Sequence, residues 1–155
     1  MIRRTTIPLN SIHQTGAAMG RLAIEYARDM APYAALPVTE VQRLVRQIPY
    51  VRDPEGEEAV HRPWITLMGR GIGRDCDDKS ICMGAWARLR GYPFRFVAVG
   101  RGTPGSKSKY HHVFCEIDLP GYGWTRVDAT YDHDRIGVWK EYRNRCVIFT
   151  TEARA

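Results

Sequence analysis

The sequence predicts an α+β domain, with helices first and an antiparallel sheet of about three to four strands after them. Up to about residue 90, apolar residues recur with the spacing of helices that pack on a core. From residue 94 onward the apolar period becomes two, and glycine and proline separate the segments, as in strands joined by turns. We expect a single domain over residues 1–155, because this length suits one hydrophobic core.

Two helices are expected before residue 50. The first covers residues 16–31 and is expected to end at Pro32, and the second covers residues 39–48, with Thr39 as its N-cap. Their apolar positions are Met19, Leu22, Ala23, Tyr26 and Met30 in the first helix, and Val41, Leu44, Val45 and Ile48 in the second. Each set falls on one face of its helix, so each face is expected to pack on the core.

An irregular segment, residues 50–73, precedes the third expected helix. It holds several prolines and the glycine-rich run from Gly69 to Gly73, and a stretch of this length without regular structure is uncommon unless it serves a function. The third helix is expected over residues 76–90, with Gly91 as the residue that ends it. Its buried stripe is expected to contain Ile81, Cys82, Ala85, Trp86 and Leu89.

The strands are expected over residues 94–99, 110–119, 123–128 and 145–150. The turn at residues 120–123 joins the second strand to the third, so these two strands are expected to be neighbours.

The composition excludes several function classes. No apolar run approaches the roughly 20 residues of a membrane span, and no apolar stretch follows the basic residues at the start, so neither a membrane contact nor a signal peptide is expected. The formal charge of +6 is spread along the chain, which favours a solvated surface over a nucleic-acid partner. We therefore expect a cytoplasmic protein with free thiols, because none of the four cysteines forms a Cys-x-x-Cys pair or a zinc pattern.

One glycine-rich motif lacks the neighbouring structure that a nucleotide-binding site requires. Residues 100–105 fit the pattern G-x-G-x-x-G, but a dinucleotide site needs a helix directly after it, and a strand follows here. A phosphate-binding loop is also excluded, because Ser106 stands where lysine is required. We interpret the segment as a hairpin loop, and its place beside His112 makes it a candidate rim of a site.

Cys76 is the candidate nucleophile. It stands where the glycine-rich segment becomes a helix, and a helix N-terminus favours the thiolate form of a thiol whose pKa is otherwise ~8.5. Cys82 falls on the buried stripe, and Cys115 and Cys146 belong to the strand region, so we expect no catalytic role for these three.

A thiol nucleophile needs a base and a group that orients the base. His111 and His112 both open the second strand, and alternation places them on opposite faces, so the pattern alone does not choose between them. Asp128 ends the neighbouring strand and is the candidate orienting carboxylate. The chain order Cys, His, Asp favours a catalytic role for Asp128 over that of a turn residue.

Three segments of the sequence resemble the transglutaminase-like superfamily in the same order. Residues 73–97 resemble its cysteine box, residues 112–117 resemble its histidine strand, and residues 123–130 resemble its aspartate strand. The resemblance is strongest over residues 50–130 and selects His112, because His111 does not match. Arg74 adds one residue between Gly73 and the acidic position, and Ala129 stands where proline is commoner. Residues 1–35 lie outside the resemblance and are expected to form a helical cover.

The resemblance implies a papain-like core with a catalytic triad of Cys76, His112 and Asp128. It implies that the thiolate attacks a peptide-like amide and forms a thioester, as in a cysteine peptidase or amidase. The Cys76 N–H is the expected oxyanion donor, and weaker candidates for oxyanion or substrate contacts are Tyr50, Trp64 and Trp124. Asp77 and Asp78 are expected to stabilise the first helical turn.

The resemblance is to small stand-alone microbial or phage members of the superfamily. Two alternatives therefore stay open: a cross-linking transglutaminase, and a non-enzymatic structural or assembly protein, virion-associated if phage-encoded. We expect a peptide or protein substrate and no cofactor, and no calcium-loop pattern is visible.

Overall fold

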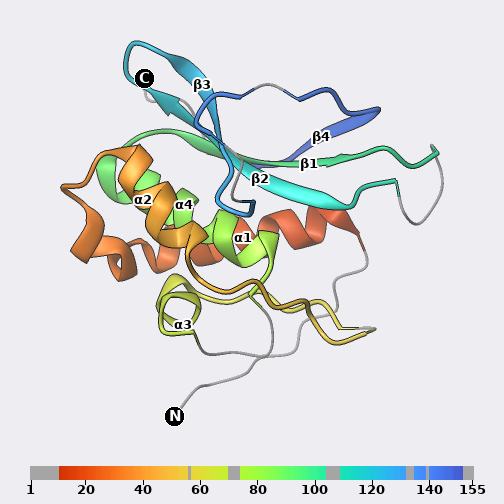
Figure 1. Ribbon diagram of the computed structural model, residues 1–155, viewed down its shortest axis with the longest axis horizontal. Coiled ribbons are helices and arrows are strands. Elements are labelled where there is room, and N and C mark those ends of the chain that lie inside the picture. Colours follow the sequence, from red (N-terminus) through yellow and green to blue (C-terminus); the bar gives the residue numbers. More distant parts are fainter. Residues whose placement is uncertain are drawn as a thin grey trace.

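The computed structural model describes residues 11–55, 57–69, 74–103, 109–131, 135–138 and 140–151. Helices lead the chain, and four strands follow (Figure 1). The helices are α1 (Ile12–Glu25), the 3-10 helix η1 (Ala27–Tyr33), α2 (Val38–Arg46), α3 (Pro63–Leu67) and α4 (Cys76–Arg90). The strands are β1 (Phe94–Gly100), β2 (His112–Leu119), β3 (Gly123–Val127) and β4 (Asn144–Thr150). The predicted α+β class is confirmed.

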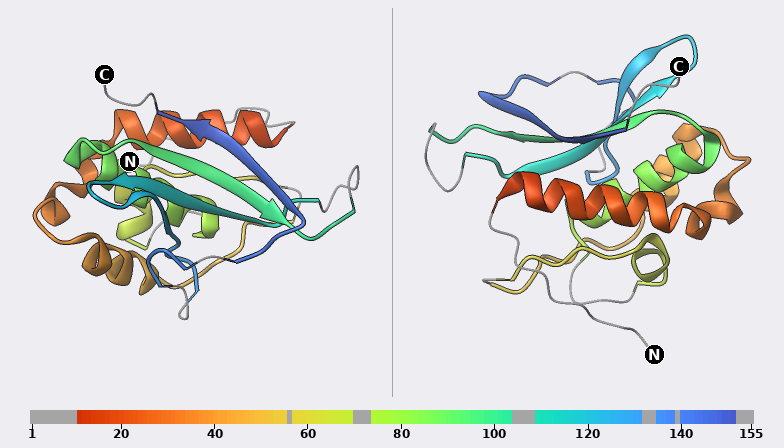
Figure 2. Two further views of the ribbon diagram at one scale, coloured as in Figure 1. Left: turned by 90° about the horizontal axis from the view of Figure 1, so that it is seen from above. Right: turned by 180° about the vertical axis from the view of Figure 1, so that it is seen from behind.

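The strands form one antiparallel sheet in the order β3-β2-β1-β4. The β2–β1 register pairs His112 with Val99, and the β2–β3 register pairs Cys115 with Val127. Helices α1 and α4 lie against the same face of this sheet (Figures 1 and 2). The start of α4 and the start of β2 therefore lie close together.

The main core fills the space between the sheet and these helices. Trp86 of α4 is fully buried there, as predicted, and its indole N–H donates to the carbonyl of Tyr33 at 3.0 Å. Gly84 lets α4 approach the sheet, because a Cβ at this position would lie 2.8 Å from the rings of Phe94 and Phe96. On the opposite face of the sheet, Tyr142 packs on a small buried cluster of Val97, Val99 and Phe114.

The helix from Cys76 to Arg90 has the predicted bounds, and Gly91 ends it in the left-handed conformation with φ 76°. Each strand agrees with its prediction to within two residues. The largest difference among the strands is that β2 begins at His112 instead of residue 110.

The first half of the chain differs more from the predictions. Helix α1 begins at Ile12, because Ser11 accepts a hydrogen bond from the Gln14 N–H and caps it. It ends at Glu25, and Pro32 lies inside η1 instead of ending a long helix, because the fixed φ of proline suits a 3-10 helix. Thr39 is not the cap of α2, since this helix begins one residue earlier, after Pro37.

The segment 50–73 was expected to be irregular, but it contains the short helix α3. Pro63 opens α3 at a position where a missing N–H costs nothing. The rest of the predicted glycine run, residues 70–73, and most of the candidate rim, residues 104–108, lie outside the described residues. Within the described part of the chain, no helix is both long and apolar enough to span a bilayer.

Candidate active site

Cys76 is the first residue of α4, and its position is fixed by side chains on either side of it. Asp75 is the N-cap, and its carboxylate accepts a hydrogen bond from the Asp77 N–H at 3.0 Å. Asp78 completes a capping box by accepting from the Asp75 N–H at 3.4 Å. The sequence Asp-Cys-Asp-Asp thus starts a helix at the cysteine, as the helix-start prediction requires.

The first turns of α4 lie against the beginning of β2. Ser80, one turn after Cys76, donates its hydroxyl hydrogen to the carbonyl of Val113 at 3.3 Å. The main-chain N–H of Val113 interacts with the Cys76 thiol and favours its thiolate form. Val113 follows His112 directly, so the start of α4 contacts the strand residue next to His112.

His112 and Asp128 are joined by a short hydrogen bond. The distance from His112 Nε2 to Asp128 Oδ2 is 2.6 Å, and the two residues are 4% and 1% exposed. The sheet explains this contact: one step beyond the Cys115–Val127 pair, Asp128 comes opposite Phe114, which shares a face with His112. Two residues that are 16 positions apart in the sequence therefore meet.

This hydrogen bond determines which imidazole nitrogen faces the carboxylate. An ionised Asp128 can only accept, so Nε2 carries a proton in this contact, and Nδ1 is the nitrogen that is not engaged by Asp128. Burial alone raises the pKa of Asp128, but the hydrogen bonds and charges of His112 and Arg126 outweigh it and hold the pKa well below its usual range. The second oxygen, Oδ1, accepts from the Thr130 N–H at 3.0 Å.

The environment of the thiol differs from the prediction for a cysteine at a helix start. Burial raises the pKa of the Cys76 thiol well above its usual value, and the carboxylates of Asp77 and Asp75 raise it further. The Val113 N–H lowers it, but by less. The expectation that the helix N-terminus lowers this pKa is therefore wrong, because desolvation and two neighbouring acids outweigh the helix dipole.

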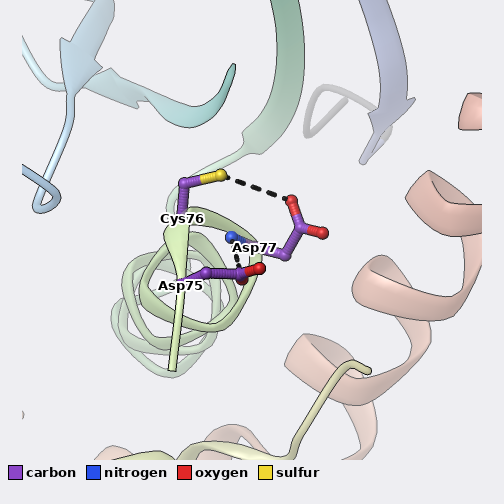
Figure 3. Close-up of side chains that lie close together, drawn as sticks. All are labelled: Asp75, Cys76 and Asp77. Carbon is purple, nitrogen blue, oxygen red and sulfur yellow. Dashed lines mark hydrogen bonds between the residues drawn. The ribbon is translucent and has the colours of Figure 1, made fainter. Parts of the chain in front are cut away.

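The three residues at the start of α4 are drawn in Figure 3. The Cys76 sulfur lies 3.8 Å from Asp77 Oδ1, and the ligand atoms of Asp75, Cys76 and Asp77 all lie within 4.8 Å of one another. Two carboxylates and a thiol could hold a divalent cation. Here Asp75 already serves as the N-cap and Asp77 is buried, so this arrangement has a sufficient explanation in the structure of the helix start.

Tyr50 lies near the candidate site. An antiparallel bridge between Val51 and Arg74 brings the segment before α3 beside the start of α4. Burial and the nearby Cys76, Asp75 and Tyr131 raise the pKa of Tyr50 to about 12, so its hydroxyl is a proton donor at neutral pH. The side chain is half exposed, which suits a residue at the edge of a site.

Trp64 and Trp124 are tied to other parts of the fold. The main-chain N–H of Trp64 donates to Asp29 of η1 at 3.0 Å. Trp124 lies at the opposite end of β3 from Asp128, and the Arg95 guanidinium stacks on its ring at 4.3 Å. These contacts tie Trp64 to η1 and Trp124 to β1.

Several further residues contact the His112–Asp128 pair, and Arg126 and Tyr131 are two that were missed in the sequence. Arg126 donates to Asp128 Oδ2 at 2.9 Å, and the Tyr131 ring lies 5.2 Å from the His112 ring. Strand alternation places Arg126 on the same face as Glu116 and therefore as His112, which is a pattern that could have identified it. Tyr131 follows the strand, where alternation gives no information.

The other three cysteines lie in the core and strand positions that the sequence predicts. Cys82 and Cys115 are fully buried in the core, and Cys146 is a partly exposed residue of β4. All four cysteines are free thiols. The sulfur of Cys146 lies 3.9 Å from Nε2 of His13, so this thiol has an imidazole neighbour.

The comparison with protein families assigns residues 22–129 to the transglutaminase-like superfamily. This match covers more than half of the chain, so the chain belongs to the transglutaminase-like superfamily. Family membership supports cysteine-dependent acyl transfer as the general chemistry of this fold. The comparison with curated proteins gives no significant match, and neither does the comparison with solved structures.

Proposed function

We propose that this protein is a cysteine-dependent hydrolase of peptide-like amides, with Cys76 as nucleophile, His112 as base and Asp128 as the orienting carboxylate. The observation that carries the proposal is the buried 2.6 Å hydrogen bond between His112 and Asp128, beside the strand residue whose main chain interacts with the Cys76 thiol. An imidazole that a carboxylate holds in one orientation, together with a thiol at a helix start, is the set of groups that thiol acylation requires.

In the proposed reaction, Nδ1 of His112 takes the thiol proton as the sulfur attacks the amide carbonyl. Negative charge then develops on the carbonyl oxygen, where the N–H of Cys76 in the first helical turn is a suitable donor. The carbon–nitrogen bond breaks, the imidazolium gives its proton to the departing amine, and a thioester remains. Water, deprotonated by the same imidazole, attacks the thioester and releases the acid and the free thiol.

The raised pKa of the thiol fits this sequence of steps. Burial and the neighbouring acids keep Cys76 protonated at rest, so proton transfer to His112 has to accompany the attack. Such a thiol reacts well only when a bound substrate holds its carbonyl against the sulfur.

Labelling with peptide-like acyl electrophiles, read by mass spectrometry on the separate cysteine peptides, tests the proposal. At neutral pH we expect Cys76 to be labelled faster than Cys146, and His112→Ala to slow Cys76 by about 10²–10⁴-fold, which is the usual contribution of a general base. Cys146 is an internal control, because it is a partly exposed thiol with its own imidazole neighbour.

A panel of peptide amides, followed by amine release, then tests hydrolysis. Cys76→Ala is expected to abolish release while the unfolding midpoint is retained. Amine release that persists in Cys76→Ala, or Cys76 labelling that is equally fast in His112→Ala, would contradict the proposal and favour a non-enzymatic role for the fold.

A further inference from the structure

Arg126 is a buried cation directly behind the proposed base. It is only 8% exposed, and its Nη2 lies 2.9 Å from Asp128 Oδ2, the same oxygen that accepts the hydrogen bond from His112. Asp128 therefore receives donors on both oxygens: His112 and Arg126 on Oδ2, and the Thr130 N–H on Oδ1. With these three donors, the carboxylate cannot rotate without losing a charge-assisted hydrogen bond.

The guanidinium is itself held by residues from two other parts of the chain. It stacks on the ring of Phe114 in β2 at 4.2 Å, and its Nη2 donates to the Tyr142 hydroxyl at 3.3 Å. Tyr142 in turn packs on the buried cluster of Val97, Val99 and Phe114. Arg126 thus connects the Asp128 carboxylate to the centre of the sheet.

Burying this charge is costly, and packing alone does not require it. A buried ion pair seldom stabilises a fold more than apolar residues of similar volume would, and Phe114 already offers Arg126 an apolar neighbour. An arginine at this position therefore points to a role in holding the carboxylate.

We propose that Arg126 is a positioning residue: with Tyr142 it fixes the Asp128 carboxylate so that His112 keeps its orientation toward Cys76. The expected effect on reaction rate rests on the proposed function. The effect on the His112–Asp128 hydrogen bond does not, because that bond can be observed without any turnover.

The kinetic test measures saturable labelling of Cys76 by the acyl electrophile, separated into a maximal rate and a half-saturating concentration. We expect Arg126→Met to lower the maximal rate about 10–100-fold, as for other groups that orient a reacting side chain, and to leave half-saturation within about twofold. Arg126→Lys should recover part of the lost rate, because lysine restores a positively charged donor but not the planar guanidinium group. Arg145→Gln is the matched control, since Arg145 pairs with the buried Glu116 on the same sheet and not with Asp128.

The spectroscopic test follows the Nε2–H proton of His112 by ¹H NMR. This proton should give a low-field resonance that is retained in Arg145→Gln and shifted or lost in Arg126→Met. If Arg126→Met does not fold, Tyr142→Phe replaces it, with an expected loss in maximal rate of about 2–5-fold from one missing hydrogen bond.

The outcomes separate the two proposals. Folded Arg126 or Tyr142 variants with an unchanged maximal rate and an unchanged resonance overturn the positioning role. Absence of Cys76 labelling in the unaltered protein overturns the proposed function instead, and the resonance in Arg126→Met then decides the role of Arg126.

Discussion

Asp77→Asn tests the electrostatic account of the nucleophile. Asp77 Oδ1 lies 3.8 Å from the Cys76 sulfur, and the residue is 6% exposed (Figure 3). A negative charge at this position opposes the thiolate, and asparagine removes the charge at nearly constant shape. Burial, with the acids Asp75 and Glu58, also raises the pKa of Asp77 itself, so its charge appears at higher pH than for an exposed aspartate.

The size of the effect follows from the distance. Two unit charges 3.8 Å apart interact by about 4 kcal/mol at the effective dielectric constant of about 20 that suits protein sites, which corresponds to about 3 pKa units. Cys76 is partly exposed, and solvent reduces this value, so we expect Asp77→Asn to lower the pKa of the thiol by about 1–3 units. Below that pKa, the thiolate fraction at a given pH rises about tenfold for each unit.

The assay is the rate of alkylation of Cys76 by iodoacetamide between about pH 6 and pH 10, with the Cys76 peptide quantified by mass spectrometry. In Asp77→Asn the rate of Cys76 alkylation at each pH in this range should rise, while that of Cys146 should not change. Asp118→Asn is the matched control, because it removes the same charge at the far end of β2. An unchanged or lower rate of Cys76 alkylation in Asp77→Asn would refute the account.

Two further predictions concern stability. The pKa of Asp75 is raised to about 7 by burial and by the charges of Asp78 and Asp53, so the folded state binds more protons than the unfolded state between about pH 4 and pH 7, and stability falls as pH rises through this range. Asp75→Asn keeps a capping side chain but removes the ionisable group. The free energy of unfolding in urea should therefore equal that of the unaltered protein near pH 4.5 and exceed it at pH 8 by about 1–3 kcal/mol. Equal free energies of unfolding at pH 8 would contradict this prediction. Gly16→Ala should destabilise the fold by about 1–3 kcal/mol, because its Cβ would lie 2.3 Å from the Ile148 carbonyl oxygen and this clash exceeds the ~1 kcal/mol gain in helix propensity. The control is Ala17→Gly at an exposed position of the same helix, which should cost only about 1 kcal/mol. A Gly16→Ala variant that is more stable than the unaltered protein would contradict the prediction, because β4 would then move away from the new Cβ at little cost.

Helix α4 could be predicted at both ends because its determinants are local. Asp75 caps it with its own side chain, and Gly91 ends it in a conformation that favours glycine. The 3-10 helix η1 was missed for the opposite reason. The periodicity of residues 16–31 fits one long helix. The two parts pack differently: both contact α4, but α1 also contacts β4, whereas η1 also contacts α3.

The candidate site was likewise predictable from the sequence only in part. The chain order of Cys, His and Asp and the alternation of β2 nominated Cys76, Asp128 and either His111 or His112, and the resemblance to the family then selected His112. None of these could give the pKa of the thiol, because this depends on how deeply α4 is buried and on where the Asp77 carboxylate points. Trp124 was nominated as a neighbour on the aspartate strand, but β3 separates it from Asp128 by its own length.

The charges around the candidate site have a consistent arrangement. Acids surround the thiol, while cationic and N–H donors surround Asp128, so the site favours a neutral thiol and an ionised carboxylate that holds the Nε2–H of His112. A preformed thiolate would react with any small alkylating agent, whereas this thiol needs a bound carbonyl to draw the proton toward His112. Cys76 should therefore exceed Cys146 in reaction with acyl electrophiles and lose that advantage with iodoacetamide. An equal advantage with both reagents would mean that the thiolate exists before substrate binds, and that the acids at the start of α4 do not control it.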